Sequence, residues 1–431
     1  MGMTSAPRVS RGPLVAAVLL FLLMTAVMAM RFARDYPHRG PDVYSGDYLA
    51  AYKDAGIWYE VGRQVLAGQP VGRQDYRYPP TFAVLIAPLT ALPSTVYYFL
   101  WYLLNVVLFV VAVRLARQLA WPAGESPPSR LLWLPVALAL PYAADNLLLG
   151  QANLLMTALV YWSLLELARG REWRAGAILG ASVALKVFTF PLLAYLLFRR
   201  RWRAVAAVLL STLFFLLVAP APFRGATRNF REVTAWGQRV VEPYLTQGKA
   251  GDWGQHAIDY GNQSLQGVLN RLLTHTEAGV LARKEQPFYV NLTDLPERRV
   301  NLLVGLSFLG LAAWAALSCG WRAPRGWRPV AAESSLAVIF LLLVSALSWT
   351  YFFVMMLLPI TVCLALLCRS EGLGVGTRRM LTVAIWAQGI ALLSLASPYA
   401  RAAGAICWAA VLTYVALGLA CRELRRGEAT G

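Results

Sequence analysis

The sequence is poor in charged side chains. Asp, Glu, Lys and Arg make up only 14% of the 431 residues, whereas a soluble globular domain carries about 25%. Hydrophobic residues account for 58% of the chain instead. This scarcity of charge excludes an ordinary soluble protein, because water cannot be the main solvent of such a chain.

Cysteine is also scarce, and its placement excludes disulfide chemistry. The five cysteines lie within or at the ends of apolar runs, where an oxidising compartment does not reach them. No pair of them has the spacing of zinc ligands, and His256 and His275 are isolated histidines with no other residue at metal-ligand spacing. We therefore expect no disulfide, no metal site and no cofactor.

Long apolar runs take the place of the missing charge. A helix of about 20 apolar residues spans the hydrocarbon core of a membrane, and several runs approach or reach that length. They recur along the whole chain, at 14–30, 205–218, 336–347 and 402–420 among others. We predict an all-α polytopic membrane protein that forms a single domain over residues 1–431.

The formal charge of +18 raises the question of nucleic acid. Basic residues of membrane proteins gather in short cytoplasmic loops, and here the arginines cluster just after apolar runs. The clusters are 114–117, 169–174, 199–203, 322–328, 378–379 and 422–426. This positive-inside pattern argues against a nucleic-acid partner and predicts which ends of the helices face the cytoplasm.

Placing these clusters inside gives one consistent path through a bacterial plasma membrane. Both termini are then cytoplasmic, with an uncleaved first helix at 13–30, although that region resembles a secretory signal. About twelve membrane segments result when half-helices count separately. Besides the first helix they are 94–117, 131–144, 146–168, a broken pair over 175–198, 205–218, 300–318, 334–348, 350–368, 380–396 and 402–421.

Two long polar segments, 31–93 and 220–299, are predicted to lie outside the cytoplasm. Connections of that length usually carry function. Within the first, the apolar stretch 81–92 is too short to span, so we expect it to be interfacial or re-entrant. No internal repeat is visible, which argues against the duplicated halves of many transporters.

Residues 175–198 have arginines at both ends, which a single crossing would place on opposite sides of the membrane. Two half-helices that meet near Lys186 keep both clusters inside. Broken helices are tolerated at membrane depth only where they are buried in protein or line a cavity. The predicted hairpin therefore points to a site.

Asp54 opens a short amphipathic segment in the first polar region. At helical spacing Ile57, Trp58, Val61 and Val65 share one face, as in a helix that lies at the interface. A partly desolvated carboxylate at its start suits a general base acting on a sugar hydroxyl. The alternative is a first-turn acid that the helix dipole favours.

Other polar residues of the first segment have open roles. Asp42 and Asp47 could serve in place of Asp54 or be solvated loop acids. Tyr78 precedes Pro79 and Pro80, and the paired prolines fix the return of the chain to the membrane. Contact of Tyr78 with substrate and a purely structural role are both open.

Gln151, Asn153 and Lys186 are polar residues in apolar surroundings. Buried amides need partners, so Gln151 and Asn153 either bond across helices or face a polar cavity. A lysine within the membrane suggests function, and an anionic lipid phosphate is a natural partner for Lys186. A structural pair with an intramembrane carboxylate is the alternative.

The second polar segment ends in Gly-Asn262-Gln263-Ser264-Leu, with Arg271 shortly after. The amides and hydroxyl suit sugar hydroxyls and the arginine suits a phosphate; helix capping beside a solvated arginine is the alternative. Near the end of a later helix, Trp349 and Tyr351 could contact substrate or belong to an aromatic belt.

These motifs, in this order, resemble glycosyltransferase family 87 of the GT-C superfamily. The resemblance rests on an outer Asp helix, Tyr-Pro-Pro at 78–80, Gly-Gln-x-Asn at 150–153, the membrane lysine, Gly-Asn-Gln-Ser-Leu at 261–265 and Ser-x-x-Ser-Trp at 345–349. It covers roughly residues 50–365.

The resemblance implies a GT-C-like bundle with an outward-facing site. It also implies a polyprenyl-phosphate sugar donor, usually mannose, a lipid or glycan acceptor, and inversion at the anomeric carbon. The family's general base then corresponds to Asp54. One departure is that Ala346, Tyr351 and Phe352 stand where family members commonly have a proline and two histidines.

Two other functions compete with the sugar transferase. One is a transporter or flippase for a lipid-linked or anionic solute, with the hairpin at Lys186 as its binding site. The other is a non-catalytic scaffold for envelope synthesis, which the two missing histidines favour.

Overall fold

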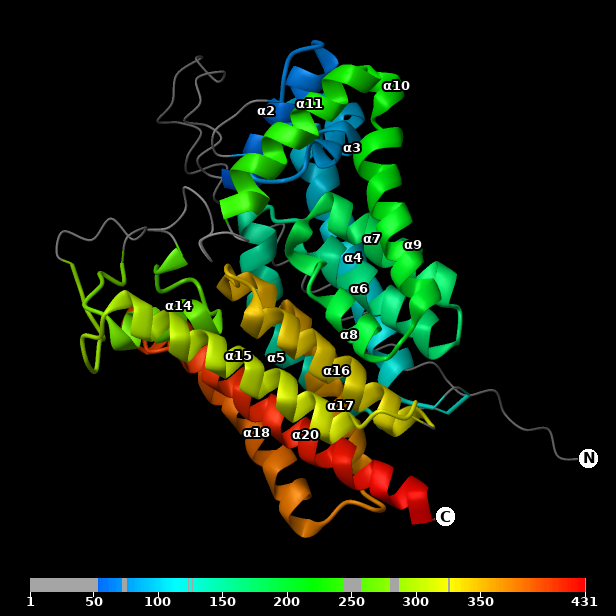
Figure 1. The fold of residues 1–431 in the computed structure, drawn as a ribbon, viewed down its shortest axis with the longest axis vertical. Helices are drawn as coiled ribbons and strands as arrows, with labels where there is room; N and C mark the ends of the chain where they lie inside the picture. The colour runs from blue at the N-terminus through cyan, green and yellow to red at the C-terminus, as the bar shows by residue number, and fades with distance from the viewer. Residues whose placement is uncertain are drawn as a thin grey trace, which may run out of the picture.

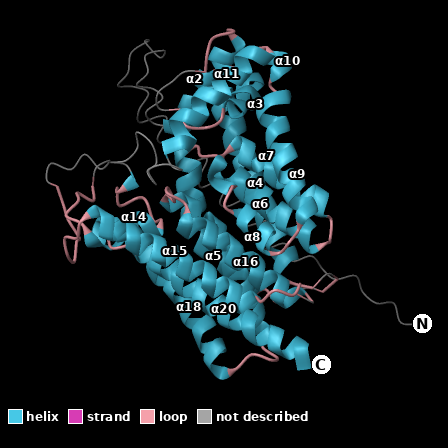
Figure 2. Ribbon diagram, viewed as in Figure 1, coloured by secondary structure: helices cyan, strands magenta, loops and turns pink. Residues whose placement is uncertain are grey.

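The computed structural model describes residues 53–71, 76–122, 124–125, 127–243, 257–279, 287–324 and 326–430. The predicted first helix and the residues Asp42, Asp47 and His256 lie outside these ranges. The described part is built of helices and contains no strand (Figure 2). A single isolated bridge pairs Asn262 with Trp349.

Seven of the described helices are long and apolar enough to cross a membrane, and shorter apolar helices pack among them. The prediction of an all-α polytopic membrane protein is confirmed, while the count of about twelve segments stays a prediction. The seven spans are α4 (Ser94–Ala120), α9 with its extension (Trp202–Arg224), α15 (Glu297–Cys319), α16 (Trp327–Val344), η6 with α17 (Thr350–Cys368), α18 with η7 (Val375–Ala396) and α20 (span Ala405–Gly427).

The arginine clusters meet at one end of the bundle, which we call the arginine-rich end. The guanidinium of Arg201 pairs with Glu172 at 3.0 Å, and Arg169 Nη2 donates to Gln118 Oε1 at 3.2 Å. Arg328 donates to the backbone oxygen of Glu371 at 2.6 Å. Clusters that are far apart in the sequence therefore share one side, as the positive-inside pattern predicts.

The broken hairpin is confirmed at Lys186. Helix α7 (Glu172–Leu185) ends there, and the chain returns through η2 (Val187–Thr189) and α8 (Leu192–Phe198). Both ends of the hairpin lie at the arginine-rich end, because Glu172 begins α7 and its partner Arg201 immediately precedes α9 (Trp202–Leu213). Lys186 itself has an extended backbone, with φ −153° and ψ 108°.

Close packing of α7 on α9 holds the hairpin in place. A Cβ added at Gly180 would lie 2.5 Å from the backbone oxygen of Val208. The hydroxyls of Ser211 and Thr212 donate across the contact to Ala177 and Gly180 carbonyls, at 2.8 and 3.2 Å. Small residues that let backbones approach are the usual means by which membrane helices associate.

The opposite end carries three short helices, α2 (Lys53–Leu66), α3 (Pro80–Thr90) and α11 (Ala226–Trp236), which gather at the top of Figure 1. Trp236 at the end of α11 and Arg239 in the following turn η4 (Gly237–Val241) hold the loop before α3. Trp236 Nε1 donates to the oxygen of Arg77 at 2.9 Å, and Arg239 to that of Tyr76 at 3.0 Å. The two long polar segments of the sequence therefore meet in space.

Several predicted helix boundaries are wrong: the helix expected at 334–348 is α16 at Trp327–Val344, and the boundary near residue 145 bears on the site. We expected a helix to end at residue 144 and the next to begin at 146, but α5 runs over Arg130–Leu149 and α6 over Asn153–Ala168. Gly150 stops α5 because its backbone is left-handed, with φ 67°, a conformation that glycine adopts most easily. Asn146 is thus in the last turn of one helix rather than at the start of another.

Candidate functional site

Helix α2 positions Asp54 through its buried face. Trp58, Val61 and Val65 are buried, as the helical spacing predicts. Trp58 meets the rings of Tyr78 and Trp101 edge to face, with centroids 5.2 and 5.3 Å apart. Asp54 lies in the first turn and is half-buried.

Contacts with α4 and with the loop after α5 fix the start of α2. Tyr97 donates its hydroxyl to the oxygen of Ala55 at 3.2 Å, and Trp101 Nε1 donates to the oxygen of Gly150 at 2.9 Å. A Cβ added at Gly150 would lie 2.6 Å from Cβ of Ala55. Asp54 is therefore carried by a rigid part of the molecule.

A chain of hydrogen bonds joins three segments next to Asp54. Tyr78 donates to Gln151 Oε1 at 3.3 Å, and Gln151 Nε2 donates to the hydroxyl of Tyr351 at 3.0 Å. Burial, then the nearby Asp54 carboxylate, raises the pKa of Tyr78 well above its ordinary value. Tyr78 is accordingly a neutral hydrogen-bond donor at physiological pH. Gln151 bonds across segments, which is one of the two roles expected for it.

Lys186 faces the same place from the break in the hairpin. Its Nζ donates to Asn153 Oδ1 at 2.7 Å and lies over the rings of Phe352 and Tyr78, 4.2 and 5.0 Å from their centroids. Its hydrogen-bond partner is the amide of Asn153, and the Asp54 carboxylate also interacts with it electrostatically, so the carboxylate pair named as the alternative stays open. Phe352 thus contributes a cation–π contact.

Asp54 and Lys186 belong to one site. The Asp54 carboxylate interacts electrostatically with Lys186, Tyr78 and Tyr351, each of which comes from a different segment. The structure therefore brings together seven of the residues singled out in the sequence: Asp54, Trp58, Tyr78, Gln151, Asn153, Lys186 and Tyr351. A small pocket lies beside them, lined by Ala55, Tyr98, Trp101, Tyr102, Asn105, Leu147 and Gly150.

The Gly-Asn-Gln-Ser-Leu motif holds the backbone that leads to Tyr351. Asn262 Oδ1 accepts from the backbone nitrogen of Ser348 at 2.8 Å, and its Nδ2 donates to the oxygen of Ala346 at 3.0 Å. Ser264 caps α14 (Leu265–Leu273) by accepting from Gly267 at 3.1 Å. These contacts fix the backbone of residues 346–348, shortly before Tyr351. Trp349, which follows them, packs on Gly261. They favour the capping alternative over sugar contact.

Gln263 and Arg271 are likewise engaged by protein. Gln263 Nε2 donates to the backbone oxygens of Tyr260 and Arg401, at 2.8 and 2.7 Å. Arg271 is fully buried and donates to the oxygens of Ala402 and Asp259 at 2.9 and 2.8 Å. Burial lowers the pKa of Arg271 to about 10, which leaves it charged. It is not the solvated arginine of our alternative, and the geometry gives no support to the phosphate contact we expected of it.

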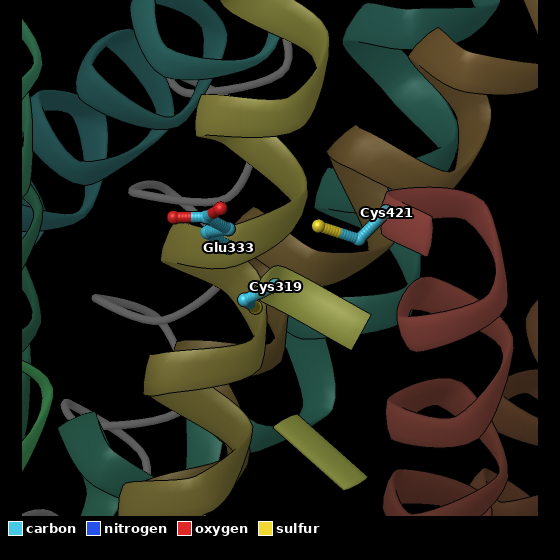
Figure 3. A group of neighbouring side chains, drawn as sticks. All are labelled: Cys319, Glu333 and Cys421. Atoms are coloured by element: carbon cyan, nitrogen blue, oxygen red, sulfur yellow. The ribbon is translucent and has the colours of Figure 1, made fainter. Parts of the chain in front are cut away.

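A group with metal-ligand chemistry lies far from this site, at the arginine-rich end (Figure 3). Ligand atoms of Cys319, Glu333 and Cys421 lie within 4.8 Å of one another and are buried. Arg425 donates to Glu333 Oε1 at 2.8 Å, and Arg199 pairs with the same oxygen. Two guanidinium groups thus compensate the carboxylate. We assign the group to packing of α15, α16 and α20 rather than to metal binding.

Sequence reasoning missed two ionisable residues at the edge of the site, Asp145 and Arg401. Asp145 lies just before the last turn of α5 and interacts electrostatically with Tyr351 and with Arg401. The signal was available, since Asp145 is an acid at the end of an apolar run. It escaped notice because the predicted helix stopped one residue before it.

Comparison with known proteins decides the family. The model of glycosyltransferase family 87 matches residues 76–346. The chain belongs to glycosyltransferase family 87. This match includes the segments that carry Tyr78, Gln151, Asn153, Lys186 and the Asn262 motif.

Several curated relatives of this family 87 chain are mycobacterial. It is 29% identical over 313 residues to a polyprenol-phosphate-mannose-dependent alpha-(1-2)-phosphatidylinositol mannoside mannosyltransferase of Mycobacterium tuberculosis, covering 69% of this chain and 64% of that one. It is 27% identical over 410 residues to the protein of that name in Mycolicibacterium smegmatis, with 85% and 83% covered.

A further relative is named for a phosphatidylinositol pentamannoside. The chain is 26% identical over 286 residues to a polyprenol-phosphate-mannose-dependent alpha-(1-2)-phosphatidylinositol pentamannoside mannosyltransferase of Mycobacterium tuberculosis, with 65% of this chain and 56% of that one covered. The two M. tuberculosis relatives are thus matched over less than two thirds of their own length. No solved structure matches the chain.

Proposed function

We propose that this family 87 protein transfers a sugar, mannose, from a polyprenyl-phosphate carrier to a lipid or glycan acceptor of the cell envelope, with inversion. The observation that carries the proposal is the single site that holds the Asp54 carboxylate and the Lys186 ammonium group. A general base and a cation for a phosphate leaving group are the two elements that such a transfer needs.

In the proposed reaction, Asp54 takes the proton of an acceptor hydroxyl while that oxygen attacks the anomeric carbon of the donor. The bond between this carbon and the phosphate oxygen breaks, and polyprenyl phosphate leaves with the electron pair. Lys186 neutralises the charge of the leaving phosphate. Because the leaving group is already a phosphate ester anion, this charge stabilisation supplies much of the catalysis.

The neighbouring side chains support these two groups. Tyr78, Gln151 and Tyr351 form a hydrogen-bonded row near Asp54, and their hydroxyls and amide suit sugar hydroxyls. Asn153 and the ring of Phe352 hold the lysine at the break in the hairpin. Trp58 fixes α2 and with it the direction of Asp54.

We place the site on the extracytoplasmic side of a bacterial plasma membrane, with both termini in the cytoplasm and residues 1–431 as one GT-C-like domain. In support, the site lies at the end of the bundle opposite the arginine clusters, which are expected to face the cytoplasm. The polar segments 31–93 and 220–299 would then both be outside.

The substitution Asp54→Asn tests the proposed reaction. It removes the base while keeping the size of the side chain, so transfer from polyprenyl-phosphate mannose in membranes should fall at least about 100-fold, in line with the usual contribution of a general base. The measurement is incorporation of labelled mannose into extractable product, with protein amount checked by immunoblot.

Asp294→Asn is the matched control, because Asp294 is an exposed acid at the same end of the bundle that accepts a bond only from the backbone of His275. It should transfer sugar at the wild-type rate. Full activity in Asp54→Asn would remove Asp54 from the mechanism. Solute uptake into proteoliposomes without any sugar transfer would favour the transporter instead.

A further inference from the structure

Asp145 occupies a position that helix stability does not explain. It lies just before the last turn of α5, toward the negative end of the helix dipole, where an acid is unfavourable. The side chain is half-buried in an apolar helix, and carboxylates at membrane depth are costly. Its carboxylate forms no hydrogen bond or salt bridge with any residue in the described ranges, so a structural partner does not account for it either.

Arg401 presents an opposite charge to Asp145 and attracts it electrostatically. It lies in the short helix α19 (Pro398–Ala402), and its guanidinium group covers the ring of Tyr260 at 4.5 Å. Its backbone oxygen accepts from Gln263 at 2.7 Å, so the segment that fixes Trp349 and Tyr351 also fixes Arg401. Its Nε is buried without a hydrogen-bond partner among the described residues.

Both residues are built into the walls of the site. Asp145 precedes Asn146, whose amide donates to the backbone oxygen of Gln151 at 3.3 Å, and Gln151 in turn binds Tyr351. Gln263 donates its backbone nitrogen to Ser348 at 2.7 Å, three residues before Tyr351. The carboxylate and the guanidinium attract each other electrostatically, yet no salt bridge joins these two described side chains.

We propose that Asp145 and Arg401 form a second subsite, beside Tyr351, that binds sugar hydroxyls of the acceptor. A carboxylate only accepts hydrogen bonds and a guanidinium only donates them. A sugar with two neighbouring hydroxyls satisfies both, donating to Asp145 and accepting from Arg401. A free phosphate does not, because Asp145 repels it.

This inference rests on the proposed function, which makes one half of the site the place of the donor. Lys186 with Asp54 serves the donor phosphate and the attacked carbon, and the Asp145–Arg401 subsite holds the acceptor so that one hydroxyl reaches Asp54. The subsite therefore commits this protein to an acceptor that is itself glycosylated, not to a simple lipid alcohol.

The test measures the two substrates separately, with Asp145→Asn and Arg401→Lys. Labelled polyprenyl-phosphate mannose is the donor, and membranes of a strain that lacks this protein are the acceptor source. Each variant should need about tenfold more acceptor membranes for half-maximal transfer, as expected for the loss of one charged hydrogen bond. The KM for the donor should stay within about threefold of wild type, a change of less than 1 kcal/mol.

Asp294→Asn and Arg299→Lys are matched controls, because both residues are exposed at the same end of the bundle. They should leave both values unchanged. An unchanged acceptor requirement in Asp145→Asn and Arg401→Lys, or a change in donor KM alone, overturns the subsite while leaving the proposed function intact. Absence of transfer by the wild-type protein overturns both.

Discussion

At the scale of single residues, Lys186 is the group whose role is easiest to separate from folding. Lys186→Met keeps the length and the apolar stem of the side chain but removes its charge. A charged hydrogen bond is worth about 1.5–3 kcal/mol. We therefore expect KM for polyprenyl-phosphate mannose to rise about 10- to 100-fold, with binding of a polyprenyl-phosphate competitor weakened in parallel.

Arg299→Met serves as the control for Lys186→Met, since it removes an exposed cation from the same end of the molecule. The two variants should show equal protein levels. A wild-type donor KM in Lys186→Met would mean that the lysine only holds Asn153 and the break in the hairpin.

For Arg271→Met we expect the opposite result, a loss of stability without a specific loss of donor binding. It holds three backbone carbonyls from two segments, those of Ala402, Asp259 and Ile258. Arg271→Met leaves these acceptors buried and unpaired, which should cost at least about 3 kcal/mol. The expected observation is a lower Tm in detergent, with a donor KM close to wild type for the folded fraction. A normal Tm with a raised donor KM would instead return Arg271 to the phosphate site.

At the scale of elements, the contact between α7 and α9 determines where Lys186 is placed. Gly180→Leu inserts a side chain where the backbone of Val208 already lies. Overpacking of this kind costs about 1–3 kcal/mol and moves the backbone. We expect a lower Tm together with a loss of transfer, because the two helices must separate and Lys186 moves with α7.

Gly310→Leu is a matched control for Gly180→Leu. Gly310 lies in α15 with no atom within 4 Å of an added Cβ. Gly310→Leu should leave Tm and transfer unchanged, although both substitutions exchange a helical glycine for leucine. Equal behaviour of the two variants would refute a special role for the α7–α9 contact.

Elements of this protein are largely predictable from its sequence because the membrane imposes local rules. Charge placement alone required a break near Lys186, and the structure has it there. The end of α5 was misplaced because the sequence shows an apolar run but not which backbone angles Gly150 adopts. Asp145 went unnoticed for the same reason.

The site is less predictable than the elements, because a polar side chain has the same sequence signal whether it binds substrate or protein. Gln151 and Asn262 are both amides beside glycines. Gln151 forms hydrogen bonds with two tyrosines of the site, whereas Asn262 forms them with the backbone of Ala346 and Ser348. Only the partners, which are up to 200 residues away in the chain, separate these roles.

At the scale of the whole molecule, the orientation in the membrane decides which pool of substrates reaches the site. Leu292 is 81% exposed and follows α14 at the end opposite the arginine clusters, and the side chain of Glu371 is 79% exposed between α17 and α18 at the arginine-rich end. Four of the five native cysteines are buried, which keeps background labelling low.

Leu292→Cys should therefore react with a membrane-impermeant maleimide on intact cells, and Glu371→Cys only after the cells are permeabilised. The reverse pattern would place the site in the cytoplasm, where nucleotide sugars rather than lipid carriers are the usual donors. A lipid-linked donor would then have no evident advantage, so this one measurement of sidedness tests the physical reason for proposing a polyprenyl carrier.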